Sequence, residues 1–279
     1  MSEKKKIAIV LSGGGTKCAY AAGALLALAD QYKFSNPDLV ISESSGTISA
    51  MYYLSEQYEH MISGWLIAPT IPKFISMLQW PVVDVDVLVD IFLRKSYPLH
   101  EKKLRENRAE LLIPLTRIDD GELVYHKLSG RDDPYEMIRA STAIPLLYGK
   151  TVALHGTMYI DGGFGSYPID HVKEAVKQGA TDIIFIRSTN GPNTATRQIL
   201  QVASLFWKQN GDIGLARAAA REVKAEPDYL PPARVNLITL TSPKKEQWIL
   251  GKNISELKRL IDRGYSDAVE SSALKKLFS

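Results

Sequence analysis

The sequence predicts an α/β protein in which helices cover a parallel β-sheet. Residues 5–11 contain a continuous apolar run rich in β-branched residues, which is typical of a strand buried on both faces. Residues 17–31 are rich in Ala and Leu and predict a helix, and residues 38–43 and 45–57 repeat the strand and the helix. Two successive strand–helix units indicate the start of a parallel sheet with helices packed on it.

The chain between residues 60 and 100 breaks this pattern. Trp, Phe, Met and Pro occur there at irregular spacing, which predicts short helices, among them 64–67 and 73–78, and no strand. No change in composition and no linker divides the chain. We therefore expect one domain over residues 1–279 with a helical, cap-like insertion at about 60–100.

Turn signals and apolar periodicity predict the remaining elements. They are hairpins at 109–117 with 122–128 and at 150–154 with 158–160, helices over 134–142, 169–178, 194–209 and 212–224, strands over 182–187 and 234–239, and a C-terminal amphipathic helix over 254–278 with Gly264 as its weak point.

Charge and cysteine content narrow the class of protein. A formal net charge of +3 over 279 residues gives no case for nucleic acid binding and would not repel an anionic membrane surface. Cys18 is the only cysteine, which excludes an internal disulfide and fits a reducing compartment. The apolar run after Lys6 is too short for a signal peptide, and no stretch reaches the length of a membrane span. We therefore expect a cytoplasmic protein whose contact with a membrane is at most transient and peripheral.

The second predicted strand ends in a serine-rich turn, residues 42–46 (SESSG), at the start of a helix. A tight turn of this kind strains its central serine, exposes the hydroxyl and needs small residues two positions before and after it. Gly46 sets the register, so Ser44 is the central serine and Ser42 stands where glycine is usual. A serine that only caps the helix, Ser44 or Ser45, is the alternative.

The first predicted strand ends in three glycines, Gly13, Gly14 and Gly15. Without side chains in the way, their N–H groups can point into a cleft and bind a phosphate or an oxyanion. The segment lacks the G-K-[ST] of a Walker loop, and Cys18 replaces the last glycine of a dinucleotide fingerprint. A plain tight turn explains the triplet equally well.

A third turn, residues 160–163 (IDGG), places Asp161 directly after a strand. Asp161 there is either a base, an orienting acid or an ordinary Asp-Gly turn residue. Acyl transfer from a serine needs oxyanion donors, a strained serine and a base, and the three turns could supply one each. A triad of Ser44, Asp161 and His171 has the chain order of α/β-hydrolases, but those folds place the serine after several strands rather than after the second.

Taken together with residues 139–145 (RASTAIP), the three turns resemble the patatin-like phospholipase family. Residues 12–18 (SGGGTKC) resemble its G-G-G-x-R-G loop, 42–46 its G-x-S-x-G turn, 160–163 its D-G-[GA] motif and 139–145 its A-S-x-A-x-P segment. Each motif alone is weak, but four in the same order are specific. The resemblance spans roughly residues 5–190.

The resemblance implies a three-layer α/β/α fold with a mostly parallel central sheet. It also implies hydrolysis of phospholipids or other acyl esters by a Ser–Asp dyad without histidine, with no metal and no cofactor. By the same resemblance Ser44 is the nucleophile and Asp161 the base. The oxyanion loop is then Gly13, Gly14 and Gly15.

Three positions depart from the family pattern, since Ser42 and Cys18 replace glycine and Lys17 replaces arginine. Lysine keeps the charge but loses the planar fork that braces a loop through two hydrogen bonds. Two other classes therefore stay open. One is a weakened or non-catalytic lipid-binding protein with this fold, and the other is a phosphate- or nucleotide-binding α/β protein that uses the glycine loop.

For a lipid ester, the segment 60–100 is the candidate for an acyl-chain pocket or a lid. Its apolar residues, Trp65 and Trp80 among them, would line a greasy cleft close to Ser44. A helical cap that only covers the sheet explains the same residues.

Overall fold

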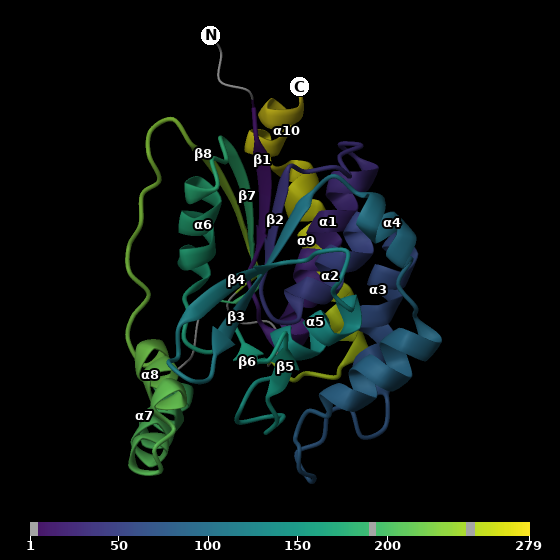
Figure 1. Cartoon of the computed structure of the whole chain (residues 1–279). Helices are drawn as coiled ribbons and strands as arrows, with labels where there is room; N and C mark the ends of the chain where they lie inside the picture. Colours follow the sequence, from purple (N-terminus) through teal and green to yellow (C-terminus); the bar gives the residue numbers. More distant parts are fainter. Residues whose placement is uncertain (1–4, 190–193, 244–248) are drawn as a thin grey trace.

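The computed structural model describes residues 5–189, 194–243 and 249–279, and Figure 1 shows how their elements are arranged. The strands are β1 (Ile7–Leu11), β2 (Leu39–Ser42), β3 (Glu110–Arg117), β4 (Leu123–Lys127), β5 (Val152–Leu154), β6 (Thr157–Asp161), β7 (Asp182–Arg187) and β8 (Asn236–Thr241). They form an eight-stranded sheet in the order β5-β6-β3-β2-β1-β7-β8, with β4 pairing β3 outside this path.

The sheet is mostly parallel, as the sequence predicts. Strands β3, β2, β1, β7 and β8 run in the same direction, whereas β4 and β6 run antiparallel to β3, and β5 antiparallel to β6. The glycine loop after β1 and the serine turn after β2 therefore leave the sheet at the same edge. Ligands of open α/β sheets bind at this carboxyl edge.

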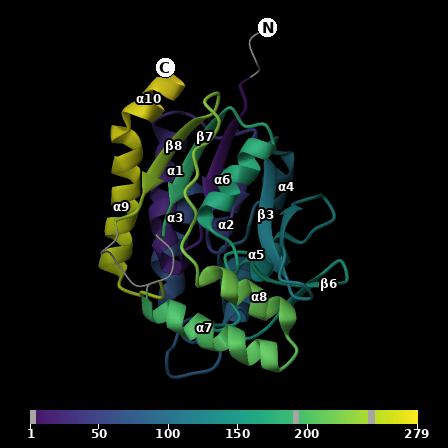
Figure 2. The same cartoon turned by 90° about the vertical axis from the view of Figure 1, so that its left-hand side faces the viewer.

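Helices cover both faces of the sheet, which gives the three layers (Figures 1 and 2). Successive side chains of β1 alternate between two apolar cores: Ile9 and Leu11 pack towards α1, α2 and α9, while Ala8 and Val10 pack towards α6. Helices α7 and α8 pack on each other near the carboxyl edge. The helices are α1 (Ala19–Asp30), α2 (Gly46–Leu54), α3 (Tyr58–Ile67), α4 (Glu101–Glu106), α5 (Pro134–Ser141), α6 (Pro168–Lys177), α7 (Thr194–Gln209), α8 (Ile213–Glu222), α9 (Ile254–Glu270) and α10 (Ser272–Phe278).

The C-terminal helix is interrupted, but not at the expected residue. A Cβ atom on Gly264 would lie 2.0 Å from the Tyr20 carbonyl oxygen, so this glycine is where α9 packs closely on α1 rather than a weak point. The break comes at Ser271, whose Oγ accepts a hydrogen bond from the Leu274 N–H at 3.2 Å and caps α10.

The segment 60–100 contains no strand among its described residues, as expected, apart from an isolated bridge between Ile75 and Val83. The helix expected over 73–78 is wrong, because residues 71–83 form a loop with prolines near both ends. A π-helix over Val87–Ser96, which the sequence analysis did not predict, follows the loop. Nowhere in the described part of the chain is a helix both long enough and apolar enough to cross a membrane.

Candidate active site

Ser44 and Asp161, which are far apart in the sequence, meet at the carboxyl edge of the sheet. Ser44 Oγ donates a hydrogen bond of 2.6 Å to Asp161 Oδ2, and both residues are buried. The register of the sheet explains the encounter. Ile41, three residues before Ser44, pairs with Leu112 of β3, and Leu115 of the same strand pairs with Asp161, so β3 brings the ends of β2 and β6 close together.

The serine turn is tight and strained. Ser44 has a φ of 53°, a left-handed conformation that a non-glycine residue adopts at a cost of about 1 kcal/mol or more. A Cβ atom on Gly46 would lie 3.2 Å from the Ser12 carbonyl oxygen, so the start of α2 approaches β1 closely. Ser42 is fully buried with its hydroxyl 3.4 Å from Thr47 Oγ1, so the turn accommodates this departure from glycine.

The glycine loop lies against the serine turn. A Cβ atom on Gly13 would come within 2.8 Å of Ser44 Cβ, and Gly15 has a φ of 57°, so both positions require glycine. Ser45 Oγ donates to the Gly15 carbonyl oxygen at 2.9 Å and ties the loop to the turn. Within residues 5–189, 194–243 and 249–279, the N–H groups of Gly13, Gly14 and Gly15 donate no hydrogen bond. These backbone donors are therefore available to a ligand beside Ser44.

Cys18 is fully buried behind the glycine loop. Its Sγ donates a weak hydrogen bond to the Ser12 carbonyl oxygen at 3.6 Å and lies 3.2 Å from Ser45 Oγ. Burial raises the pKa of the Cys18 thiol to about 12. The thiol therefore stays protonated at neutral pH and packs as a small apolar side chain, which accounts for a cysteine where the family motif has glycine.

Residues 139–145 brace both members of the pair. Ser141 Oγ, at the end of α5, donates to the Ser44 carbonyl oxygen at 3.3 Å. The Asp161 N–H donates to the Ala143 carbonyl oxygen at 3.2 Å, and the Gly163 N–H donates to Asp161 Oδ1 at 2.8 Å. The backbones of Ser44 and Asp161 are therefore both held by this segment, and the Asp161 carboxylate is also fixed by the Gly163 N–H.

The Asp161 carboxyl is a stronger base than an ordinary aspartate. Burial, and then the nearby charge of Glu43, raise its pKa to about 8, while the hydrogen bonds from Ser44 and Gly163 act in the opposite direction. A base whose pKa lies near neutrality is matched to taking a proton from a hydroxyl.

His171 lies close to the site but does not touch the pair. Its Nε2 is 2.9 Å from Glu43 Oε2, and its Nδ1 is 3.0 Å from the Tyr125 hydroxyl. Both ring nitrogens are thus occupied by other partners. The alternative triad of Ser44, Asp161 and His171 is therefore not formed.

Comparison with known proteins identifies the family of this chain. A family model for patatin-like phospholipases matches residues 9–172. This chain belongs to the patatin-like phospholipase family. It is also 29% identical over 194 residues to an uncharacterized protein, YjjU of Escherichia coli (strain K12), in an alignment that covers 66% of this chain and 52% of that relative. The chain thus spans about half the length of the curated relative it matches. The resemblance that the four motifs indicated is confirmed, and membership in this family suggests a lipid acyl hydrolase.

Two acidic residues of this patatin-like site were not predicted. Glu43 occupies the variable position of the serine turn, and a Cβ atom on Gly163 would lie 2.1 Å from its Oε1. Burial, and then the charges of Glu43 and Asp161, raise the pKa of Glu222 at the end of α8 to about 8. No local motif marks either residue, since their proximity to Asp161 arises only from the folded chain.

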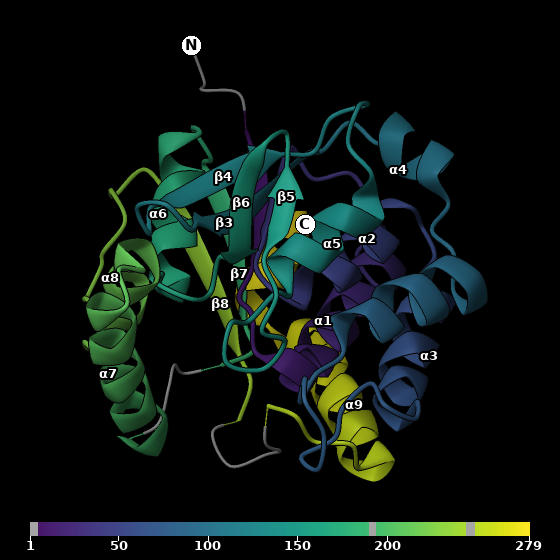
Figure 3. The same cartoon turned by 60° about the horizontal axis from the view of Figure 1, so that its bottom comes forward.

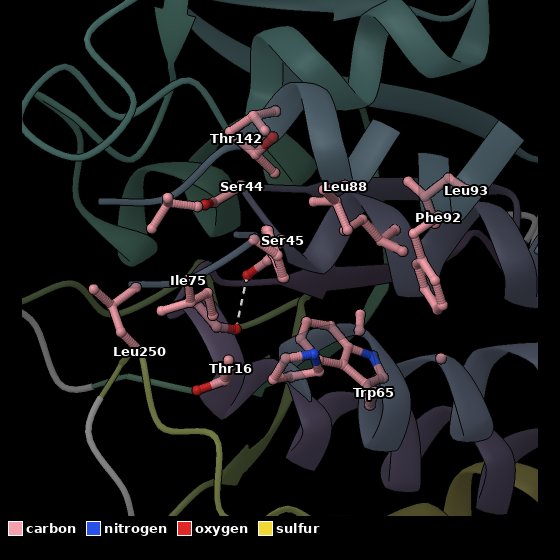
Figure 4. Close-up of a pocket in the computed structure, with 18 of the residues that line it drawn as sticks. Thr16, Ser44, Ser45, Trp65, Ile75, Leu88, Phe92, Leu93, Thr142 and Leu250 are labelled. Atoms are coloured by element: carbon pink, nitrogen blue, oxygen red, sulfur yellow. Dashed lines mark hydrogen bonds between the residues drawn. The ribbon is translucent and has the colours of Figure 1, made fainter. Parts of the chain in front are cut away.

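An apolar cavity opens beside Ser44, and its volume is about 80 Å³ (Figure 4). Ser44 lies at one end in this view, while Phe92 and Leu93 lie at the other. The segment 60–100 supplies much of the lining, as expected, including Trp65, whose Nε1 donates to Ser49 Oγ at 2.8 Å. Trp80 does not line the cavity and is 68% exposed, so naming it as a lining candidate was wrong.

One cluster in the described part of the chain has donor atoms grouped as metal ligands often are. It comprises His126, Asp132 and His155, whose donor atoms lie within 4.8 Å of one another. His155 Nε2 is 2.7 Å from Asp132 Oδ1, and the other carboxylate oxygen accepts hydrogen bonds from Ser129. These residues do not contact Ser44 or Asp161, so the cluster lies apart from the serine–aspartate pair.

Proposed function

We propose that this chain is a serine lipid acyl hydrolase that cleaves acyl esters through a dyad of Ser44 and Asp161. The observation that carries the proposal is the 2.6 Å hydrogen bond from a strained serine to a buried carboxylate. Free backbone donors beside the serine and an apolar cavity next to it support the same chemistry.

In the first half-reaction, Ser44 Oγ attacks the ester carbonyl while Asp161 takes the hydroxyl proton. The N–H groups of Gly14 and Gly15 hold the oxyanion of the tetrahedral intermediate, and one such donor contributes on the order of 3 kcal/mol. The intermediate collapses as the ester C–O bond breaks, and the leaving alkoxide takes the proton from Asp161. An acyl-Ser44 ester and an alcohol result.

In the second half-reaction, Asp161 removes a proton from water, and the hydroxide attacks acyl-Ser44. Collapse of the second intermediate releases the carboxylic acid, and the proton returns to Ser44. The cavity lined by Trp65, Leu88 and Phe92 would hold the acyl chain, where each buried methylene contributes about 0.8 kcal/mol. We therefore expect longer acyl chains to bind better until the cavity is filled.

Hydrolysis of p-nitrophenyl butyrate tests the proposal. Ser44→Ala and Asp161→Asn should each remove nearly all turnover, because the two groups act as one unit. Ser42→Ala is the matched control, since it removes a hydroxyl from the same turn without touching Asp161. A folded Ser44→Ala protein that keeps wild-type turnover would refute the proposed nucleophile.

A further inference from the structure

A loop at the rim of the cavity exposes large apolar side chains. Leu78 is 99% exposed and Met77 62%, and Trp80 follows them in the same loop. Ile75 and Val83, which pair in the isolated bridge on either side of the exposed tip, line the cavity beside Ser44. The exposed side chains are thus continuous with the entrance to the proposed acyl-chain site.

Helix α7 carries a second exposed apolar surface. Its inward face includes Leu200, which is buried, and Trp207, whose ring packs edge-on against Phe164 at 5.7 Å. Phe164 lies three residues after Asp161, so α7 is anchored next to the base. The outward face is an apolar stripe at helical spacing, and each member is 59–69% exposed: Ile199, Val202, Leu205 and Phe206.

The two apolar segments come from distant parts of the chain but lie at the same edge of the molecule. Figures 1 and 2 show the loop 71–83 and α7 both at the lower end, where the parallel strands finish. In Figure 3, with this end turned forward, α7 lies at one side and the loop nearer the middle. The loop joins the cavity lining at Ile75 and Val83, and Trp207 packs α7 against Phe164, close to the Asp161 turn. The loop and α7 therefore flank the site.

The charged residues of the loop and of α7 are all positive. Residues 71–83 contain Lys73 and no acidic residue, and residues 194–209 contain the exposed Lys208 and no acidic residue. The other cation of α7, Arg197, is half-buried and donates to the Val223 carbonyl oxygen at 3.5 Å. An amphipathic surface with cations and an interfacial tryptophan is suited to the headgroup region of a bilayer that contains anionic lipid. These exposed side chains project from a loop tip and a helix face, which allows them to insert between lipid headgroups.

We propose that loop 71–83 and the outward face of α7 dock this protein on a lipid membrane, with the cavity entrance turned towards the bilayer. The inference rests on the proposed function, because a lipid ester is most accessible at a bilayer surface. Docking would let an acyl chain move from the membrane into the cavity past Ile75 and Val83 without crossing water.

Sedimentation with vesicles tests the docking without turnover. The Ser44→Ala protein should bind vesicles of equal parts phosphatidylcholine and phosphatidylglycerol, and should bind pure phosphatidylcholine less. Adding Leu78→Gln and Phe206→Gln should weaken binding by about tenfold or more, because two exposed apolar side chains no longer insert. The matched control is Leu230→Gln, a leucine that is 92% exposed in the connection between α8 and β8, which should bind as before.

Several other outcomes would overturn the docking. Unchanged binding of the double variant, or equal loss in Leu230→Gln, would show that these segments are not the contact. Dimerisation that the double variant abolishes, without vesicle binding, would assign the surface to a second copy of the chain. If the vesicles bind as expected but the wild-type protein does not hydrolyse soluble esters, the docking would stand and the proposed function would be refuted.

Discussion

Replacing Asp161 with asparagine should stabilise the protein, and the gain should grow with pH. The carboxyl has a pKa of about 8 in the folded protein against 3.8 for an unperturbed aspartate, with burial as the main cause. Between these values the folded state keeps a proton that the unfolded chain has released. The free energy of unfolding of the wild type therefore falls as pH rises from about 4 to 8.

The size of the effect follows from the two pKa values. A difference of one pKa unit corresponds to about 1.4 kcal/mol. Over the interval from pH 5 to pH 8, the Asp161 carboxyl should lower the free energy of unfolding by on the order of 3–4 kcal/mol. Asparagine is neutral throughout and makes no such contribution. Its amide can still accept the hydrogen bond from Ser44 or from the Gly163 N–H.

Urea unfolding of both proteins at several pH values between 5 and 8 measures this difference. Most other titrating groups are common to the two proteins and cancel, whereas the pKa of Glu222, which the Asp161 charge helps to raise, should be lower in Asp161→Asn. We expect the advantage of Asp161→Asn over wild type to increase steadily with pH. A difference that stays flat across the interval would show that the Asp161 pKa is not raised, and the argument for it as a base near neutrality would fail.

Two further predictions concern the charge beside the base and the depth of the cavity. Glu43→Gln removes a negative charge that raises the Asp161 pKa, so this pKa should fall and the rise of kcat/KM with pH should move to lower pH. A pH–rate profile superimposable on that of the wild type would contradict the role of the Glu43 charge. Gly64 lines the cavity, and a Cβ atom there would meet only the Phe92 ring at 3.8 Å, so the protein should tolerate Gly64→Ala. The larger side chain of Gly64→Leu should fill the cavity, so it should impair hydrolysis of long-chain esters and spare hydrolysis of acetate esters. Equal losses for both esters in Gly64→Leu would show that the cavity does not hold the acyl chain.

The parts of the site that the sequence could predict are those with a local physical signature. A strand followed at once by small residues identifies the turns around Gly13, Ser44 and Asp161, because each conformation depends on a few adjacent residues. Glu43 and Glu222 have no such signature, since their effect on Asp161 depends on long-range packing. His171 shows that chain order alone does not define a triad, because the order Ser44, Asp161, His171 only allowed that alternative, and folding pairs His171 with Glu43.

The same distinction between local and long-range signals applies to the helices and strands of the fold. Continuous apolar runs such as residues 182–187 predicted strands well, because a strand buried on both faces leaves a local pattern. Irregular segments did not, and the π-helix over Val87–Ser96 and the loop over 71–83 were not foreseen. The role of Gly264 was misjudged because a glycine in a helix also allows close packing against a neighbour, and the sequence does not show which neighbour is there.

The central claim is that Ser44 is a nucleophile activated by Asp161, and covalent labelling tests it most directly. The protein is treated with a fluorophosphonate, which forms a stable bond with activated serines, and then analysed by intact mass and peptide mapping. The account predicts a single adduct on Ser44 that forms far more slowly in Asp161→Asn. An adduct on another residue, or none on a folded wild-type protein, would contradict it.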